Sequence, residues 1–151
     1  MKPIIKQSLV TMFALLTLCF TVFSFTTKSG LDSYEIYLNN KLIMKQYVNQ
    51  PLNLRVLQLN QARDNDELRI NYKHCTMEGA GTDRTIVLKD EEGNTLKKWT
   101  FTNASGADLS MVIPVKELLQ LEKNNAQHDL SLYYTARELP KGETLALLRI
   151  K

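Results

Sequence analysis

Apolar and polar positions alternate with a period of two along most of the chain after residue 30, and this pattern predicts β-strands. The clearest strand is expected over residues 68–74. The positions on its apolar side are Leu68, Ile70, Tyr72 and His74. The positions on its polar side are Arg69, Asn71 and Lys73. Such a strand belongs to an antiparallel sheet that packs on a core with one side and meets water with the other.

Turn signals join the other alternating runs into three predicted hairpins. The first turns at Asn39-Asn40, because asparagine tolerates the positive φ of tight turns. Its second strand is expected to align Leu42, Met44 and Val48. The second hairpin joins residues 85–89 to residues 95–102. The third joins residues 130–135 to residues 145–150 and is expected to turn at Pro140-Lys141-Gly142.

Three further elements complete the pattern, one of them a short strand expected over residues 109–113. A strand is predicted to begin over Leu52, Leu54 and Val56. Residues 115–123 have helical spacing, and Pro114 suits the first turn of a helix because its missing N–H would be unbonded there. The expected fold is therefore mainly β: an antiparallel β-sandwich, jelly-roll or immunoglobulin-like, of about eight strands with one short helix. A small barrel is the alternative.

The first thirty residues have a different character. Lys2 and Lys6 precede a stretch, residues 9–25, that contains no charged residue. This order is typical of a secretory signal peptide, with cleavage expected after Ser24, whereas an uncleaved anchor or lipid attachment at Cys19 are alternatives. We expect residues 1–25 to be a signal peptide or N-terminal anchor, residues 26–32 a short linker, and residues 33–151 a single domain. The protein is expected to be exported, either periplasmic or secreted, with membrane contact only through residues 9–25 if they are not cleaved.

Charge and cysteine content narrow the range of partners. The chain has 151 residues and a formal net charge of +3, of which Lys2 and Lys6 supply two charges. The remainder is close to neutral, so we expect no nucleic-acid partner. After export the domain keeps only Cys75, so it can form no internal disulfide. We expect this thiol to be buried in the core, with pairing between chains or metal binding as alternatives.

His74 and Cys75 are the most reactive neighbours in the sequence, and both residue types bind zinc or copper. A metal site would need His128, the only other histidine, to join them. Adjacent strand residues point to opposite faces, which opposes a shared metal. The sequence contains no recognised catalytic motif, so we predict no catalytic residues and no cofactor.

Aromatic side chains that fall on polar faces of predicted strands could instead form a binding surface. The candidates are Tyr37, Tyr47, Trp99 and Tyr133. The first hypothesis is therefore a non-enzymatic binding or interaction module of the cell envelope that holds a protein or a glycan. The alternative is a small envelope hydrolase or metal-dependent enzyme using His74, Cys75 and His128, and a third possibility is a structural envelope protein tethered by residues 9–25. The general layout resembles small secreted β-sandwich proteins of Gram-negative bacteria, a resemblance that rests on no motif and implies no functional residues.

Overall fold

The computed structural model describes residues 30–75, 81–104 and 108–149. Within these residues the chain forms nine strands, one α-helix and one short 3₁₀ helix. The predicted signal peptide or anchor, residues 1–25, and the attachment candidate Cys19 lie outside the described residues. Among the described helices, none is long and apolar enough to cross a membrane.

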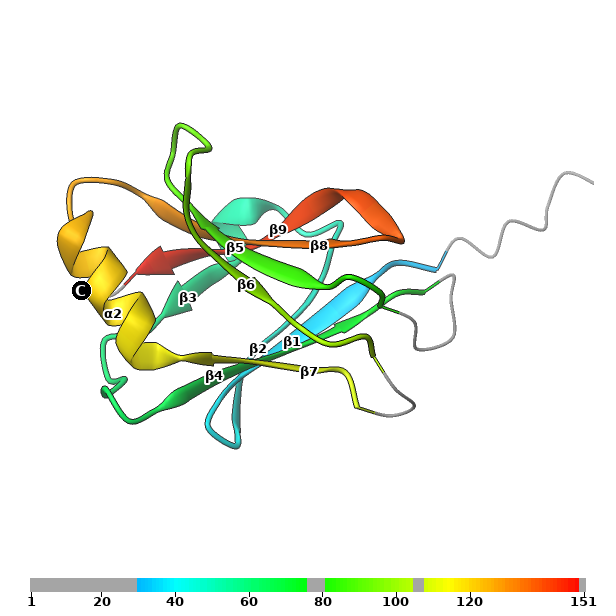
Figure 1. Ribbon diagram of the computed structural model, residues 1–151, viewed down its shortest axis with the longest axis horizontal. Helices are drawn as coiled ribbons and strands as arrows, with labels where there is room; N and C mark the ends of the chain where they lie inside the picture. Colours follow the sequence, from blue (N-terminus) through cyan, green and yellow to red (C-terminus); the bar gives the residue numbers. More distant parts are fainter. Residues whose placement is uncertain (1–29, 76–80, 105–107, 150–151) are drawn as a thin grey trace, which may run out of the picture.

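The strands form two sheets that lie in separate layers (Figure 1). The four-stranded sheet has the order β2-β1-β4-β7. Its strands are β1 (Ser33–Leu38), β2 (Lys41–Tyr47), β4 (Glu67–Lys73) and β7 (Ser110–Pro114). The five-stranded sheet has the order β3-β9-β8-β5-β6. Its strands are β3 (Val56–Gln58), β5 (Thr85–Lys89), β6 (Thr95–Thr100), β8 (Leu130–Ala136) and β9 (Leu139–Arg149). All pairs are antiparallel except β3 with β9.

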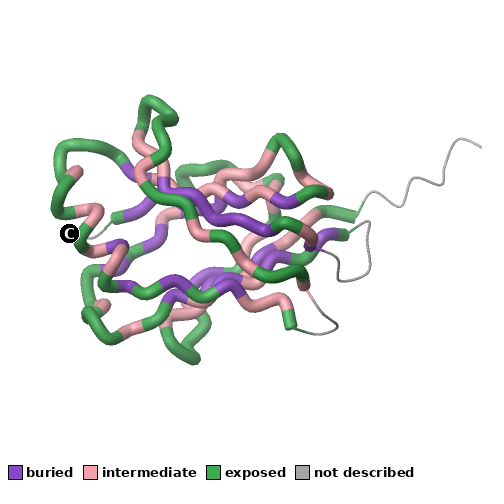
Figure 2. The backbone as a smooth tube through the Cα atoms, viewed as in Figure 1, coloured by how far each residue is buried: buried purple, intermediate pink, exposed green. Residues whose placement is uncertain are grey.

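The two sheets share one core, so the arrangement is sandwich-like. Both layers contain buried positions along their strands (Figure 2), and the buried residues of the two sheets form one hydrophobic cluster. As predicted, the apolar side of β4 is buried and its polar side is not. Between the layers, the rings of Tyr72 and Tyr134 stack with centroids 4.2 Å apart. The Tyr34 hydroxyl also crosses between the layers and donates to the backbone oxygen of Leu145, and its burial raises the pKa of Tyr34 to about 12.

The helix α2 (Val115–Asn124) follows β7 directly and closes one end of the sandwich (Figure 1). Its two fully buried side chains are Val115 and Leu118. Trp99 of β6 packs against the core, and its indole N–H donates to Glu117 of α2 at 2.9 Å. A helix of this length is marginal alone in water, so these contacts hold it in place.

Strand β2 differs from the simple alternation expected of it. The register shifts between Ile36 and Tyr37, so that Ile36 pairs with Met44 but Tyr37 pairs with Leu42. One extra residue, Ile43, is accommodated as a β-bulge. Ile43 packs against the core, and Leu42 turns outward with 44% of its surface exposed. The prediction that Leu42 and Met44 share a face is therefore wrong.

Two other local predictions are also wrong. Leu52–Leu54 form a 3₁₀ helix, η2, and the strand begins only at Val56. The last hairpin turns at Arg137 and Glu138, and Pro140–Gly142 lie inside β9. Gly142 has φ +67, and a Cβ there would overlap the ring of Tyr133, so this glycine makes an irregularity in the strand and no turn.

Arg55 fastens η2 to β9 from inside the protein. It is only 4% exposed, and its guanidinium donates to the backbone oxygens of Val48 at 2.6 Å and of Thr144 at 2.7 Å. It also pairs with the carboxylate of Glu143 at 2.6 Å. The side chain draws residues after β2 toward the five-stranded sheet, which accounts for the turn where the alternation predicted a strand.

Candidate functional site

The outer face of the four-stranded sheet carries most of the exposed apolar surface on its strands. Cross-strand pairing aligns Tyr37 with Leu42 and Arg69, and Arg69 with Val112. Tyr47 and Val112 are 49% and 37% exposed. The residues that make up this face are Ser33, Glu35, Tyr37, Leu42, Lys45, Tyr47, Arg69, Asn71, Lys73, Ser110 and Val112. Two of the four predicted aromatic candidates, Tyr37 and Tyr47, thus lie on one face.

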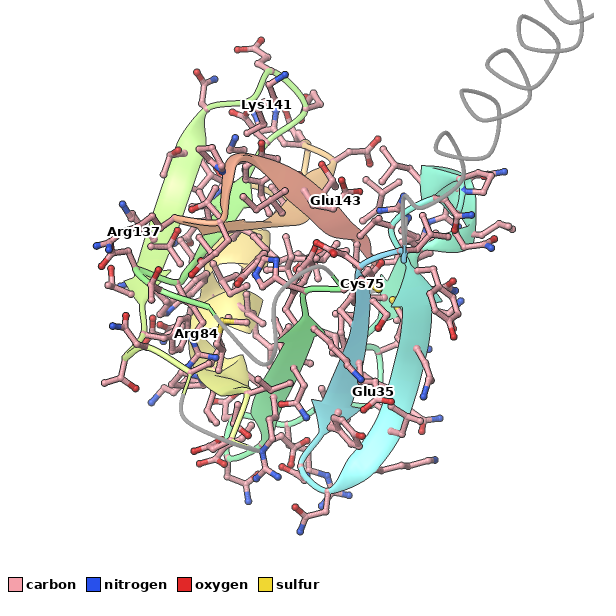
Figure 3. The ribbon with its side chains drawn as sticks, turned by 90° about the vertical axis from the view of Figure 1, so that its right-hand side faces the viewer. Glu35, Cys75, Arg84, Arg137, Lys141 and Glu143 are labelled. Carbon is pink, nitrogen blue, oxygen red and sulfur yellow. The ribbon has the colours of Figure 1, made fainter. Side chains whose placement is uncertain are left out.

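A network at its centre orders three of these side chains. Lys45 and Tyr37 both reach Glu35, with distances of 2.7 Å to its two carboxylate oxygens. The hydrogen bond from Lys45 lowers the pKa of Glu35 most, and the hydrogen bond from Tyr37 lowers it further. The same contact raises the pKa of Lys45. The Glu35 carboxylate is therefore ionised, and each of its oxygens accepts one hydrogen bond from this network. Glu35 is labelled beside β1 and β2 in Figure 3.

Beside this network, two polar atoms of β4 are covered without a hydrogen-bond partner. They are the Nε of Arg69 and the Oδ1 of Asn71, neighbouring positions on the outer side of the strand. Buried polar groups normally have a partner, so each orphan atom needs an explanation. Asn71 also lines a shallow hollow of about 310 Å³ together with Glu35, Lys45, Tyr47 and Lys73.

The other two aromatic candidates lie elsewhere. Trp99 pairs with Ile86 on the inner side of the five-stranded sheet, so it belongs to the core and to the contact with α2. Tyr133 lies on the outer side of that sheet, with the ammonium of Lys89 3.7 Å from its ring centroid. Its hydroxyl donates to the backbone oxygen of Lys141. The structure therefore separates the four predicted residues into a pair, a core residue and a residue on the opposite sheet.

His74 belongs to a buried polar cluster at the end of β4. It is 5% exposed, and its Nε2 lies 3.0 Å from the Tyr134 hydroxyl. Its Nδ1 lies 3.3 Å from Asp32, and the same carboxylate accepts hydrogen bonds from the Tyr72 hydroxyl and the Cys75 amide. Burial raises the pKa of both tyrosines. Asp32 and His74 thus contact one another and form hydrogen bonds to the surrounding groups. These contacts give the cluster a structural role between the two sheets.

Cys75 is exposed, so the prediction of a buried thiol is wrong. It lies two residues past Lys73, the last residue of β4, at the end of the two-sheet arrangement that faces the reader in Figure 3. His128 follows α2 at the opposite end, where β4 begins beside β7. The described residues contain no group of three His, Cys, Asp or Glu side chains that could hold a metal ion. The structure therefore does not bring His74, Cys75 and His128 together.

His128 instead pairs with Glu91 in the turn between β5 and β6. Its Nδ1 lies 2.7 Å from a Glu91 carboxylate oxygen, and this contact raises the pKa of His128 while lowering that of Glu91. Since a raised histidine pKa means that the pair is lost as pH rises through it, the contact is complete only below that pKa. We expect the pKa of His128, measured by NMR titration, to lie above 6.5 and to fall in a Glu91→Gln variant. An unchanged value in that variant would contradict the pairing.

No family model, curated protein or solved structure matches the chain. The class of the protein is therefore defined only by its fold and by the outer face of the four-stranded sheet. In its described part it is a mainly β protein with two sheets and one α-helix, and its candidate site is that sheet surface. Sequence analysis missed Leu42, Arg69, Asn71, Lys73 and Val112 as members of that surface. The polar side of residues 68–74 was the available signal, because a strand that pairs with the Tyr37 strand must present those positions beside Tyr37.

Proposed function

We propose that this protein is an exported, non-enzymatic binding module of the cell envelope, and that it holds its partner on the outer face of the four-stranded sheet. The observation that carries the proposal is the exposure of Tyr47, Leu42 and Val112 together on that one face. Exposed aromatic and apolar side chains supply contact area for a partner.

Export remains a proposal that rests on the amino-acid sequence. The charge-free stretch 9–25 after two lysines supports a signal peptide or anchor. A domain with Cys75 as its one cysteine after residue 25 can fold in an oxidising compartment without disulfides, because the two sheets bury a shared apolar core.

We propose further that the sandwich is immunoglobulin-like and not a jelly-roll. The strands β1, β4 and β7 follow the order A-B-E of one immunoglobulin sheet, and β9, β8, β5 and β6 follow the order G-F-C-C′ of the other. The β2 strand and the β3 strand are additions to that plan. Under this assignment the outer face belongs to the A-B-E sheet, widened by β2.

The proposed binding face is tested by removing its exposed side chains. We expect Tyr47→Ala to lower retention of the purified full chain on envelope fractions of its own host by about tenfold, since aromatic anchors typically contribute more than 1 kcal/mol to an interface. Tyr47 is half exposed, so the variant should unfold at nearly the same temperature as the wild type.

The matched control is Tyr133→Ala. It removes a tyrosine ring from the outer side of the other sheet, and we expect it to leave retention unchanged. Equal retention of wild type, Tyr47→Ala and Tyr47→Ala combined with Leu42→Ser would refute the proposed face.

A further inference from the structure

We propose that the ligand of this face is an acidic glycan, a saccharide chain that carries carboxylate groups. This inference rests on the proposed function, because it names the partner of the same face. It is argued from the charges on that face, the residues that line its hollow, and the spacing of its apolar side chains.

Charge is the first argument. The outer face presents three cations, Lys45, Arg69 and Lys73, around one carboxylate, Glu35. Glu35 is already bound to Lys45 at 2.7 Å. Arg69 and Lys73 take part in none of the ion pairs formed within the described residues. Two cations thus remain available to an anionic ligand.

The positions of these two cations can be spanned by a chain that carries several acidic groups. Arg69 and Lys73 lie on the same side of β4, four residues apart, which corresponds to about 13 Å along a strand. A saccharide chain with acidic groups on successive or alternate sugars can reach both.

The hollow beside Lys73 is lined by groups that a sugar ring can contact. The side chain of Asn71 lines this hollow, although its Oδ1 is covered from solvent. Tyr47 lines the same hollow and offers an exposed aromatic ring to the apolar face of a sugar. Lys73 lines it as well and can bind a carboxylate on that ring.

The face is less suited to a protein partner. The centre of a protein interface is depleted of charged residues and packs large apolar groups together. Here Leu42, Tyr47 and Val112 are separated by Glu35, Arg69 and Lys45, so no continuous apolar centre forms. Hydroxyl-rich and carboxylate-rich ligands match this mixture of charges and single apolar side chains.

The test is binding of defined saccharides to the full chain, measured by isothermal titration calorimetry. The probes are trigalacturonate, a guluronate trisaccharide and sialyllactose, each compared with a neutral counterpart of the same length. We expect at least one acidic probe to bind with a dissociation constant below about 1 mM and its neutral counterpart about tenfold more weakly. Binding should weaken as salt is raised, because exposed charges are screened.

Variants then assign the binding to the outer face. We expect Lys73→Met to weaken the acidic probe by about fivefold, as for an exposed charge pair. Tyr47→Ala should weaken it by about tenfold. Lys98→Met is the matched control on the outer side of the five-stranded sheet and should have no effect.

The outcomes separate this inference from the proposed function. If no acidic probe binds more tightly than its neutral counterpart, the acidic glycan is refuted. A different result would show that the face binds a protein. In that case Tyr47→Ala still lowers retention on envelope fractions, and protease treatment of those fractions abolishes retention of the wild type. If acidic probes bind but Lys73→Met and Tyr47→Ala bind them equally well, the face is refuted as the site.

Discussion

Replacing Arg55 by alanine is expected to lower the free energy of unfolding by about 3–5 kcal/mol, the cost of removing one partner from a buried ion pair. The variant would leave the backbone oxygens of Val48, Gln50 and Thr144 without the donors that now reach them. Glu143 would lose its partner as well. Because lysine has one compact donor group where arginine has a planar fork, Arg55→Lys should recover only part of the loss. Urea denaturation followed by circular dichroism measures both variants.

Arg137→Ala provides the matched control for this prediction. Arg137 also pairs with a carboxylate, Asp83, at 2.6 Å, but the two side chains are 72% and 65% exposed. An exposed pair of this kind contributes less than about 1 kcal/mol. A loss at Arg55 no larger than the loss at Arg137 would show that the buried guanidinium does not hold η2 against β9.

The second large effect is expected at Tyr134, whose ring lies between the two sheets. It is fully buried, and it stacks on Tyr72 and contacts His74. Tyr134→Ala should destabilise the protein by about 3–5 kcal/mol, because it removes a buried aromatic ring and leaves a cavity. Tyr134→Phe should cost only about 1–2 kcal/mol, because it removes only the hydroxyl that pairs with His74.

The comparison of the two variants distinguishes packing from hydrogen bonding. Equal losses for Tyr134→Phe and Tyr134→Ala would mean that the polar cluster of Asp32, His74 and Tyr134 holds the layers together, and the ring does not. If Tyr134→Ala fails to fold, Tyr134→Leu tests the same packing with a smaller change in volume. The midpoint and slope of urea unfolding are measured for each variant.

Periodicity predicted most of this fold because each sheet buries one side. The alternation in residues 68–74 is confirmed side chain by side chain, and the helix after Pro114 begins and ends near its predicted bounds. The errors have one cause in common. Leu42, Leu52 and Pro140 lie where the chain departs from a regular ladder, through a bulge, a 3₁₀ turn and a strand irregularity. The 3₁₀ turn is tied to a distant partner, because Arg55 pairs with Glu143, and the local pattern contains no information about that contact. The bulge and the strand irregularity arise within hairpins, between β1 and β2 and between β8 and β9.

The candidate site was harder to predict for a related reason. An outward-facing tyrosine has the same sequence pattern on either sheet, so Tyr37 and Tyr133 could be separated only when the strand order was known. Trp99 was expected on a surface, but it closes the core against Glu117, a contact that depends on where α2 lies. The exposure of Cys75 follows from its place just past the end of β4, one residue beyond the last buried position, His74.

The parallel pair of β3 and β9 has a consequence for the time course of folding. β3 joins the five-stranded sheet only through β9, the last described strand, with Val56 opposite Leu147. In a chain that is synthesised from its amino end, Leu57 of β3 is present before its partner strand β9. The core around this buried residue therefore cannot form until β9 is present. Such distant pairings make folding slow, because the ends of a long loop must meet before any contact forms. We therefore expect β3 to join its sheet late in folding, only after β9 is in place.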